Sequence, residues 1–183
     1  EDGTTYLETD KLYVRMRAYF DAVEVKKYLH SGGNRIASKA GINCSRVEWL
    51  DSNSNITNDI DETVKFRCYF RSIGEDGHEI TNDFVVHDLA FCKETNVVTE
   101  SQIDQHGYWR DIVAVSSSPT QDGEHWIDLS KSDCLSGSDI PIAQDDIIQL
   151  GNKTDTTRQG AIIEFVGGAD APAYQIYQGI NSY

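Results

Sequence analysis

One polar loop carries several side chains whose types and spacing could do chemistry. The segment DDIIQLGNKTDTTRQGAIIEF (Asp145–Phe165) places this loop between two apolar runs. Within it, Asn152, Asp155 and Arg158 offer an amide, a carboxylate and a guanidinium group, which could bind a small polar ligand. The alternative is a structural joint, because Asp155 or Thr154 can cap a single helical turn, TTRQ, whose free amide groups need an acceptor. We expect the joint, keep the ligand loop open, and allow Asp155 and Arg158 to pair.

A second candidate is a group of aromatic residues. Tyr108, Trp109 and Trp126 fall on one expected hairpin, and further tyrosines gather near the C-terminus. Exposed aromatic faces can stack on sugar rings, which would make these residues a carbohydrate-binding surface. Most aromatic residues in strands instead form core or cross-strand pairs, so both interpretations stay open.

The sequence contains no motif that identifies a catalytic centre. It has no G-x-S-x-G, H-E-x-x-H, P-loop or G-x-G-x-x-G pattern. Two carboxylates such as Asp128 and Glu164 could form a glycosidase pair, but with 30 acidic residues such a pairing is expected by chance. We therefore predict no catalytic residue and keep a glycan-cleaving enzyme as an alternative.

Metal-binding patterns are also weak. The stretch DSNSNITNDIDE (Asp51–Glu62) partly mimics a calcium loop, yet Ile56 stands where that loop needs glycine, and Asn58 stands at its hydrophobic position. A solvated loop is the better interpretation. We predict no metal and no cofactor.

The cysteines do not form a zinc pattern. None of the four makes a C-x-x-C pair. Cys68 and Cys92 lie in apolar, strand-like runs, where a free thiol acts as a small hydrophobe. We expect buried thiols, with a disulfide as the alternative.

Composition limits the classes of partner. The chain has 183 residues, 39% of them hydrophobic, and a formal net charge of −14, so it can form a packed core while repelling phosphate backbones. Nucleic acid is a poor partner, and no apolar run is long enough for membrane insertion. The first residues resemble no signal peptide, and the chain begins without Met, which we interpret as an excised or processed piece.

Alternating hydrophobicity predicts a mainly β protein. The run KLYVRMRAYF (Lys11–Phe20) alternates strictly, as do residues 64–73, and we also expect strands over residues 42–50, 80–86 and 88–93. Asp76-Gly77 and Asp122-Gly123 mark hairpins spanning residues 64–84 and 108–129. The expected fold is all-β and mainly antiparallel, barrel- or sandwich-like, with at most short helices.

A faint internal echo suggests two related β-subdomains. When Asp88 is aligned with Asp145, apolar residues coincide at Val85 and Ile142 and again just after each aspartate. We accordingly divide the chain into an N-terminal β segment (1–50) and subdomains at 51–105 and 106–183. One continuous domain is the alternative.

Several phrases resemble a family of tail-associated structural proteins encoded by phages and prophages of Bacteroides-type gut bacteria. They are RCYFRS, ITNDFVVHDLAFCKETNV, GYWRDIVAV, WIDLSKSDCLSGSDIPIAQDDIIQLGNKTDTTRQGAIIE and DAPAYQIYQGINSY, and the most specific pattern is QLGN-x-TD-x-x-RQ-x-A. The resemblance covers residues 11–183. Two departures stand out: the family tends to show Val-Gly-Asp where this chain has VHD (86–88) and AQD (143–145).

The resemblance implies a non-enzymatic structural module of a phage or prophage tail or fibre, part of a longer β-rich chain. Its place would be the virion, or the bacterial cytoplasm before assembly. Its partners would be other tail subunits or further copies of itself, with a host-surface glycan as a possible ligand for attachment. The alternatives are a carbohydrate-binding module and a glycan-cleaving enzyme.

Overall fold

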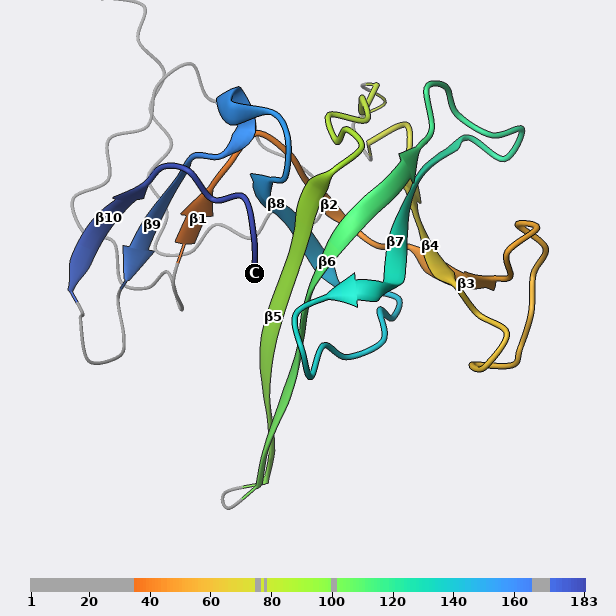
Figure 1. The fold of residues 1–183 in the computed structure, drawn as a ribbon, viewed down its shortest axis with the longest axis horizontal. Helices are drawn as coiled ribbons and strands as arrows, with labels where there is room; N and C mark the ends of the chain where they lie inside the picture. The colour runs from red at the N-terminus through yellow and green to blue at the C-terminus, as the bar shows by residue number, and fades with distance from the viewer. Residues whose placement is uncertain (1–34, 75–76, 78, 100–101, 166–171) are drawn as a thin grey trace, which may run out of the picture. The chain divides into compact units, whose positions relative to one another are not determined.

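The computed structural model describes residues 35–74, 77, 79–99, 102–165 and 172–183 (Figure 1). The chain divides into two units, Glu1–Gly32 and Gly33–Tyr183, and the description below concerns the second. The alternating run Lys11–Phe20 lies outside the described residues. The elements are β1 (Arg35–Ala37), β2 (Gly41–Asn43), β3 (Arg46–Leu50), β4 (Lys65–Arg71), β5 (Asp88–Thr99), β6 (Gln102–Val115), β7 (Glu124–Cys134), β8 (Asp146–Asn152), the 3-10 turn η1 (Thr156–Arg158), β9 (Ala161–Phe165) and β10 (Ala173–Tyr177).

The strands form two antiparallel sheets. A curled seven-stranded sheet has the order β2-β8-β5-β6-β7-β4-β3, and a three-stranded sheet has the order β1-β9-β10. The prediction of an all-β, antiparallel fold with at most short helices is confirmed. Within the described part of the chain, no helix is long and apolar enough to cross a membrane.

The two edges of the seven-stranded sheet are joined by one bent segment. β2 and β3 are the edge strands, yet only Cys44 and Ser45 separate them in the sequence. The Cys44 amide donates to the carbonyl of Asp145 (2.9 Å), and the Ser45 amide donates to the carbonyl of Tyr69 (2.7 Å). Residues 41–50 therefore pair with β8 on one side and β4 on the other, and the curled sheet becomes barrel-like.

The core fills the concave side of this sheet. β4 alternates as predicted, with Phe66, Cys68 and Phe70 buried and the side chains of Lys65 and Arg67 on the outer face. Burying a phenylalanine contributes roughly 1.5–3 kcal/mol, so the repeated inward positions dominate the stability of the barrel. The irregular segment before β5 supplies Phe84, and neighbouring strands supply the rest of the core, chiefly Ala90, Cys92, Tyr108, Ile112, Ile127, Leu129 and Ile147.

The hairpin predictions had mixed outcomes. β6 and β7 form the expected hairpin, with Gly123 at a positive φ of 73°. The long β5–β6 hairpin was not predicted, because residues 94–105 are mostly polar; Figure 1 shows it extending past the neighbouring strands. Its two strands pair residue by residue from Leu89 opposite Asp111 to Val97 opposite Ile103, and the register shifts before Thr99.

The predicted strand over residues 80–86 is wrong. This segment is irregular, and among the described residues around Gly77 the expected hairpin is reduced to a bridge between Ile73 and Glu79. The reason lies in its side chains: the Asn82 amide donates to the carbonyls of Ser116 (3.2 Å) and Trp126 (3.1 Å), which ties the segment to the ends of β6 and β7.

The three expected sequence ranges do not form separate sheets. The seven-stranded sheet takes β2 and β3 from 1–50, β4 and β5 from 51–105, and β7 and β8 from 106–183, while β6 crosses the boundary between the last two ranges. The described residues belong to the unit Gly33–Tyr183.

The internal echo corresponds to a repeated turn. His87 and Gln144 both adopt positive φ (69° and 79°), one residue before the aligned aspartates. Asp88 accepts a hydrogen bond from the Val85 amide, and Asp145 accepts one from the Ile142 amide, each at 2.9 Å. The two following strands, β5 and β8, are neighbours in the sheet. The local structure therefore repeats, although the two copies share one sheet.

Candidate functional site

The polar loop after β8 folds into the capped turn that its sequence predicts. The Asp155 carboxylate accepts hydrogen bonds from the Thr157 amide (2.9 Å) and hydroxyl (2.8 Å) at the start of η1. These donors, the Thr157 hydroxyl foremost, lower the pKa of Asp155. Asp155 thus acts as the N-cap of η1, and its oxygen is engaged within the loop.

Asn152 lies fully buried at the end of β8. Its side-chain nitrogen donates to the Asp88 carboxylate (2.9 Å). Its side-chain oxygen accepts from the amides of Thr154 (2.8 Å) and Asp155 (2.7 Å). One amide group therefore connects β5 to the loop and shapes the loop itself.

Arg158 forms its ion pair with Asp88 rather than with Asp155, the pairing that the sequence had left open. Its Nε and Nη2 atoms donate to the two carboxylate oxygens of Asp88 at 2.8 and 2.7 Å. Nη2 also donates to the carbonyl of Asp83 (2.8 Å). The Arg158 side chain is 12% exposed and that of Asp88 is fully buried. This carboxylate raises the pKa of the guanidinium.

Backbone contacts complete the loop. Gln149 donates from Nε2 to the carbonyls of Gly151 (2.7 Å) and Arg158 (2.6 Å). Gly151 has a φ of 102°, and a Cβ there would lie 2.5 Å from the carbonyl oxygen of Ile180. The Asn152 amide donates to that same carbonyl (3.0 Å). Asn152, Asp155 and Arg158 are all used inside the chain, in a joint that connects β8 of one sheet to β9 of the other.

The three aromatic candidates differ in exposure, and Tyr108 is the one that is buried. Tyr108 is only 3% exposed, and its hydroxyl donates to the Asp145 carboxylate (2.9 Å). Burial raises the pKa of this phenol far above its ordinary value. Tyr108 points into the core because it alternates with Trp109 on β6, so the exposed-aromatic interpretation does not hold for it.

The two tryptophans are half-buried and have partners. The Trp109 indole donates to the carbonyl of Leu150 (3.2 Å), and its ring makes edge contacts with Phe91 and Tyr183. The Trp126 ring is covered by the Arg67 guanidinium, 3.8 Å from the ring centre. On the face that Arg67 covers, a sugar could stack on Trp126 only by displacing this arginine.

The carboxylate pair considered for glycan cleavage is not assembled. Asp128 is fully buried in β7, where it receives Nε of Arg67 (2.6 Å) and Nζ of Lys65 (3.0 Å). Glu164 lies in β9, in the other sheet, and accepts a hydrogen bond from Tyr174 (3.0 Å). Asp128 therefore holds two cations of β4 and is closed to a substrate.

The segment that mimics a calcium loop uses its first carboxylate for backbone contacts. Asp51 accepts hydrogen bonds from the amides of Asn53 and Asn55, both at 2.8 Å. The Asn55 amide is the foremost of the donors that lower the pKa of Asp51. Glu62 accepts from the hydroxyl of Thr57 (3.2 Å). These contacts fit the solvated loop that the sequence favours.

The cysteines are thiols. Cys44, Cys68 and Cys92 are buried, as expected for the two that lie in apolar strands, and Cys134 is partly buried. Burial raises the pKa of Cys68 well above its ordinary value.

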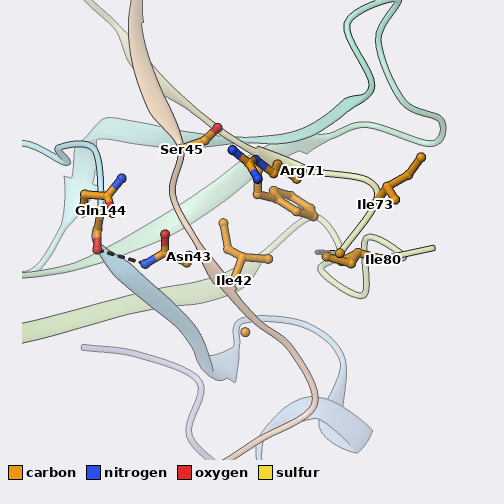
Figure 2. A pocket seen from close by; sticks show the side chains of 10 residues that line it. Ile42, Asn43, Ser45, Arg71, Ile73, Ile80 and Gln144 are labelled. Carbon is orange, nitrogen blue, oxygen red and sulfur yellow. Dashed lines mark hydrogen bonds between the residues drawn. The ribbon is translucent and has the colours of Figure 1, made fainter. Parts of the chain in front are cut away.

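One pocket opens where β2 faces the end of β4. It has a volume of about 560 Å³, and Figure 2 shows Ile42, Ile73 and Ile80 near the exposed Arg71. On its other side, Asn43 donates to the carbonyl of Gln144 (3.1 Å). Its described lining contains no carboxylate, histidine or cysteine. The arrangement could hold an apolar group beside one cation, and the Ser45 hydroxyl in the lining donates to the Glu124 carboxylate (2.9 Å).

The fold and its contacts define a barrel-like all-β module with an internal polar joint. No family model, curated protein or solved structure matches the chain.

Proposed function

We propose that this chain is a non-enzymatic structural module of a phage or prophage tail or fibre, which works by assembly. Two features support the proposal. The most specific part of the resemblance, residues 149–161, forms the joint between the sheets, and each of its candidate ligand-binding groups already has a partner inside the chain. The three-stranded sheet also exposes apolar side chains that suit contact with a neighbouring subunit.

The exposed face of the three-stranded sheet carries the proposal. Ile162 and Ile176 lie opposite each other on β9 and β10, with 48% and 74% of their surfaces exposed, and Tyr174 is 76% exposed. Because side chains alternate along a strand, these three residues share one face. Clustered exposed apolar residues of this kind mark interaction surfaces.

A second copy of the chain fits this face. Ala37 lies in register with Ile162, and Arg35 lies in register with Glu164, so an apolar row runs beside a row with both charge signs. In a two-fold pairing of identical faces, the apolar rows can pack while Arg35 of each copy meets Glu164 of the other. The face is therefore self-complementary.

Sedimentation velocity over a range of concentrations tests self-association. We expect wild type to form dimers or larger species, and Ile176→Lys to remain monomeric because a lysine would be buried at the contact. Ile56→Lys is the matched control, since Ile56 is 65% exposed on the loop after β3. A wild-type chain that stays monomeric throughout would exclude this face as a self-association surface.

Assembly into tails can be tested separately. Antibodies against the chain should label purified phage or prophage tails in electron micrographs, and mass spectrometry should find its peptides there. Tails that lack the chain would contradict the proposed function whatever its oligomeric state.

The alternative of carbohydrate binding has one supporting observation. A pocket of about 370 Å³ lies beside Phe91 and Trp109, with polar groups from Ser138 and Asp139. A glycan array would favour this alternative if a specific signal disappeared in Trp109→Ala and persisted in Trp126→Ala. A blank array would leave the assembly proposal in place.

A further inference from the structure

Asp145 is a deeply buried carboxylate with weaker charge compensation than two comparable groups. Asp88 receives the guanidinium of Arg158, and Asp128 receives both Arg67 and Lys65. Asp145 is 1% exposed, and among the described ion pairs only His106 approaches it. A buried carboxylate without a cation is costly, so this position attracts positive charge.

One oxygen of the Asp145 carboxylate has hydrogen-bond partners, and the other has none. Its Oδ2 atom accepts from the Ile142 amide and the Tyr108 hydroxyl, both at 2.9 Å, and lies within hydrogen-bonding distance of His106 Nε2 (3.3 Å). Its Oδ1 atom is buried and has no hydrogen bond. His106 Nε2 lies 3.2 Å from Oδ1, without the geometry of a hydrogen bond to that atom.

A thiol completes a three-residue cluster. The ligand atoms of Cys92, His106 and Asp145 all lie within 4.8 Å of one another. Cys92 comes from β5, His106 from β6, and Asp145 from the turn before β8. Donor atoms in a tetrahedral zinc site are roughly 3.4–3.7 Å apart, so side-chain movements of about 1 Å would bring these three to binding distance.

The surroundings of His106 also suit a ligand. Its other ring nitrogen, Nδ1, lies 3.7 Å from Oδ2 of Asp139, and that oxygen accepts the Gly107 amide (2.8 Å). Histidines that bind metals commonly direct their second nitrogen at a carboxylate, which fixes the tautomer and the ring. A proton on Nδ1 would leave Nε2 as a lone pair directed at the cluster.

We propose that Cys92 Sγ, His106 Nε2 and Asp145 Oδ1 bind a divalent transition metal of the zinc type. Thiolate, imidazole and carboxylate form a donor set suited to zinc, and the two anionic ligands balance its charge. Cys92, His106 and Tyr108 line the pocket of about 370 Å³ beside Trp109, which provides a route for the metal and room for a water as fourth ligand. The site would brace β5, β6 and β8, separately from the assembly face.

Cobalt titration of the whole chain after treatment with a chelator tests the site directly. We expect one equivalent of Co²⁺ to bind with a thiolate-to-cobalt charge-transfer band and the intense visible bands of tetrahedral cobalt. Zn²⁺ should displace the cobalt, abolish these bands and raise the melting temperature. The charge-transfer band reports the cysteine itself, so it differs from adventitious binding to surface acids.

Matched variants assign the ligands. His106→Ala, Cys92→Ser and Asp145→Asn should each weaken binding about 10–100-fold or more, on the scale seen when metal-site residues are removed. His87→Ala, Cys134→Ser and Asp146→Asn are the controls, and each should retain the band and the affinity. Far-UV circular dichroism verifies folding, and His106→Ala remains informative if the two buried substitutions unfold the chain.

Two results would contradict the proposed metal site. If folded wild type gives no thiolate band at millimolar Co²⁺, or if His106→Ala binds as tightly as wild type, the proposal is overturned. His106 would then act only as a polar contact between Asp145 and Asp139.

Discussion

Removing Arg158 should destabilise the chain far more than removing an exposed arginine. Arg158→Ala deletes both charge-assisted hydrogen bonds to Asp88 (2.8 and 2.7 Å) and the bond to the Asp83 carbonyl. Asp88 would stay fully buried, with only Asn152 and the Val85 amide as described donors. Leaving one partner of a buried pair uncompensated costs about 3–5 kcal/mol.

Counting the lost hydrogen bonds gives a similar cost in free energy of unfolding. Hydrogen bonds to charged groups contribute about 1.5–3 kcal/mol each, and two are lost. Against a total stability of about 5–15 kcal/mol for a typical domain, the variant loses a large fraction of its free energy of unfolding. The stability of Arg158→Lys should lie between that of wild type and that of Arg158→Ala, because an ammonium cannot reproduce the bidentate geometry.

Urea denaturation followed by tryptophan fluorescence measures the effect. Arg71→Ala is the matched control, since Arg71 is exposed at the end of β4, and it should change stability by less than about 0.5 kcal/mol. The double variant Asp88→Asn/Arg158→Ala should recover part of the loss, because no buried charge is left unpaired. A loss below about 1 kcal/mol for Arg158→Ala would refute the argument that this pair locks the joint.

Three further outcomes are expected. Gln144→Gly should stabilise the chain by up to about 1 kcal/mol in thermal denaturation, because Gln144 is exposed and holds a φ of 79° that suits glycine. Gly151→Ala should cost more stability than Gly137→Ala: both glycines have positive φ, but only at Gly151 would a Cβ meet the Ile180 carbonyl, at 2.5 Å. Burial raises the pKa of Asp111 in the folded chain. The protonated carboxyl therefore stabilises the fold fully below the unfolded pKa of about 4, and this contribution is lost as the pH rises through the folded pKa. Melting curves between pH 3 and pH 8 should therefore show the stability of Asp111→Asn rising relative to wild type as the pH increases, and a constant difference would contradict this.

The sequence predicted the features that depend on neighbours along the chain. Alternation over residues 64–73 predicted the buried and exposed faces of β4, and Gly123 marked the β6–β7 turn. Capping chemistry predicted η1, because a carboxylate followed by TTR supplies the acceptor that a short turn needs. Each of these features depends on interactions between residues that lie within about ten positions of one another in the sequence.

The sequence did not predict the features that depend on distant partners. Arg158 and Asp88 are 70 positions apart, and no pattern in either segment indicates that the two side chains pair. Cys92, His106 and Asp145 come from three elements and make no spacing motif. The strand predicted at residues 80–86 failed for a related reason, since Asn82 bonds across to Ser116 and Trp126.

The repeated turn connects the local pattern to both distant clusters. At Asp88 and Asp145 the preceding residue has positive φ, and the carboxylate closes the turn on the amide three residues earlier. Each turn buries a carboxylate at the start or edge of a strand, and each buried carboxylate needs a cation. Asp88 obtains one from Arg158, which locks the joint. Asp145 lies near His106 and Cys92 instead. The same turn therefore buries a carboxylate whose negative charge a bound metal would balance.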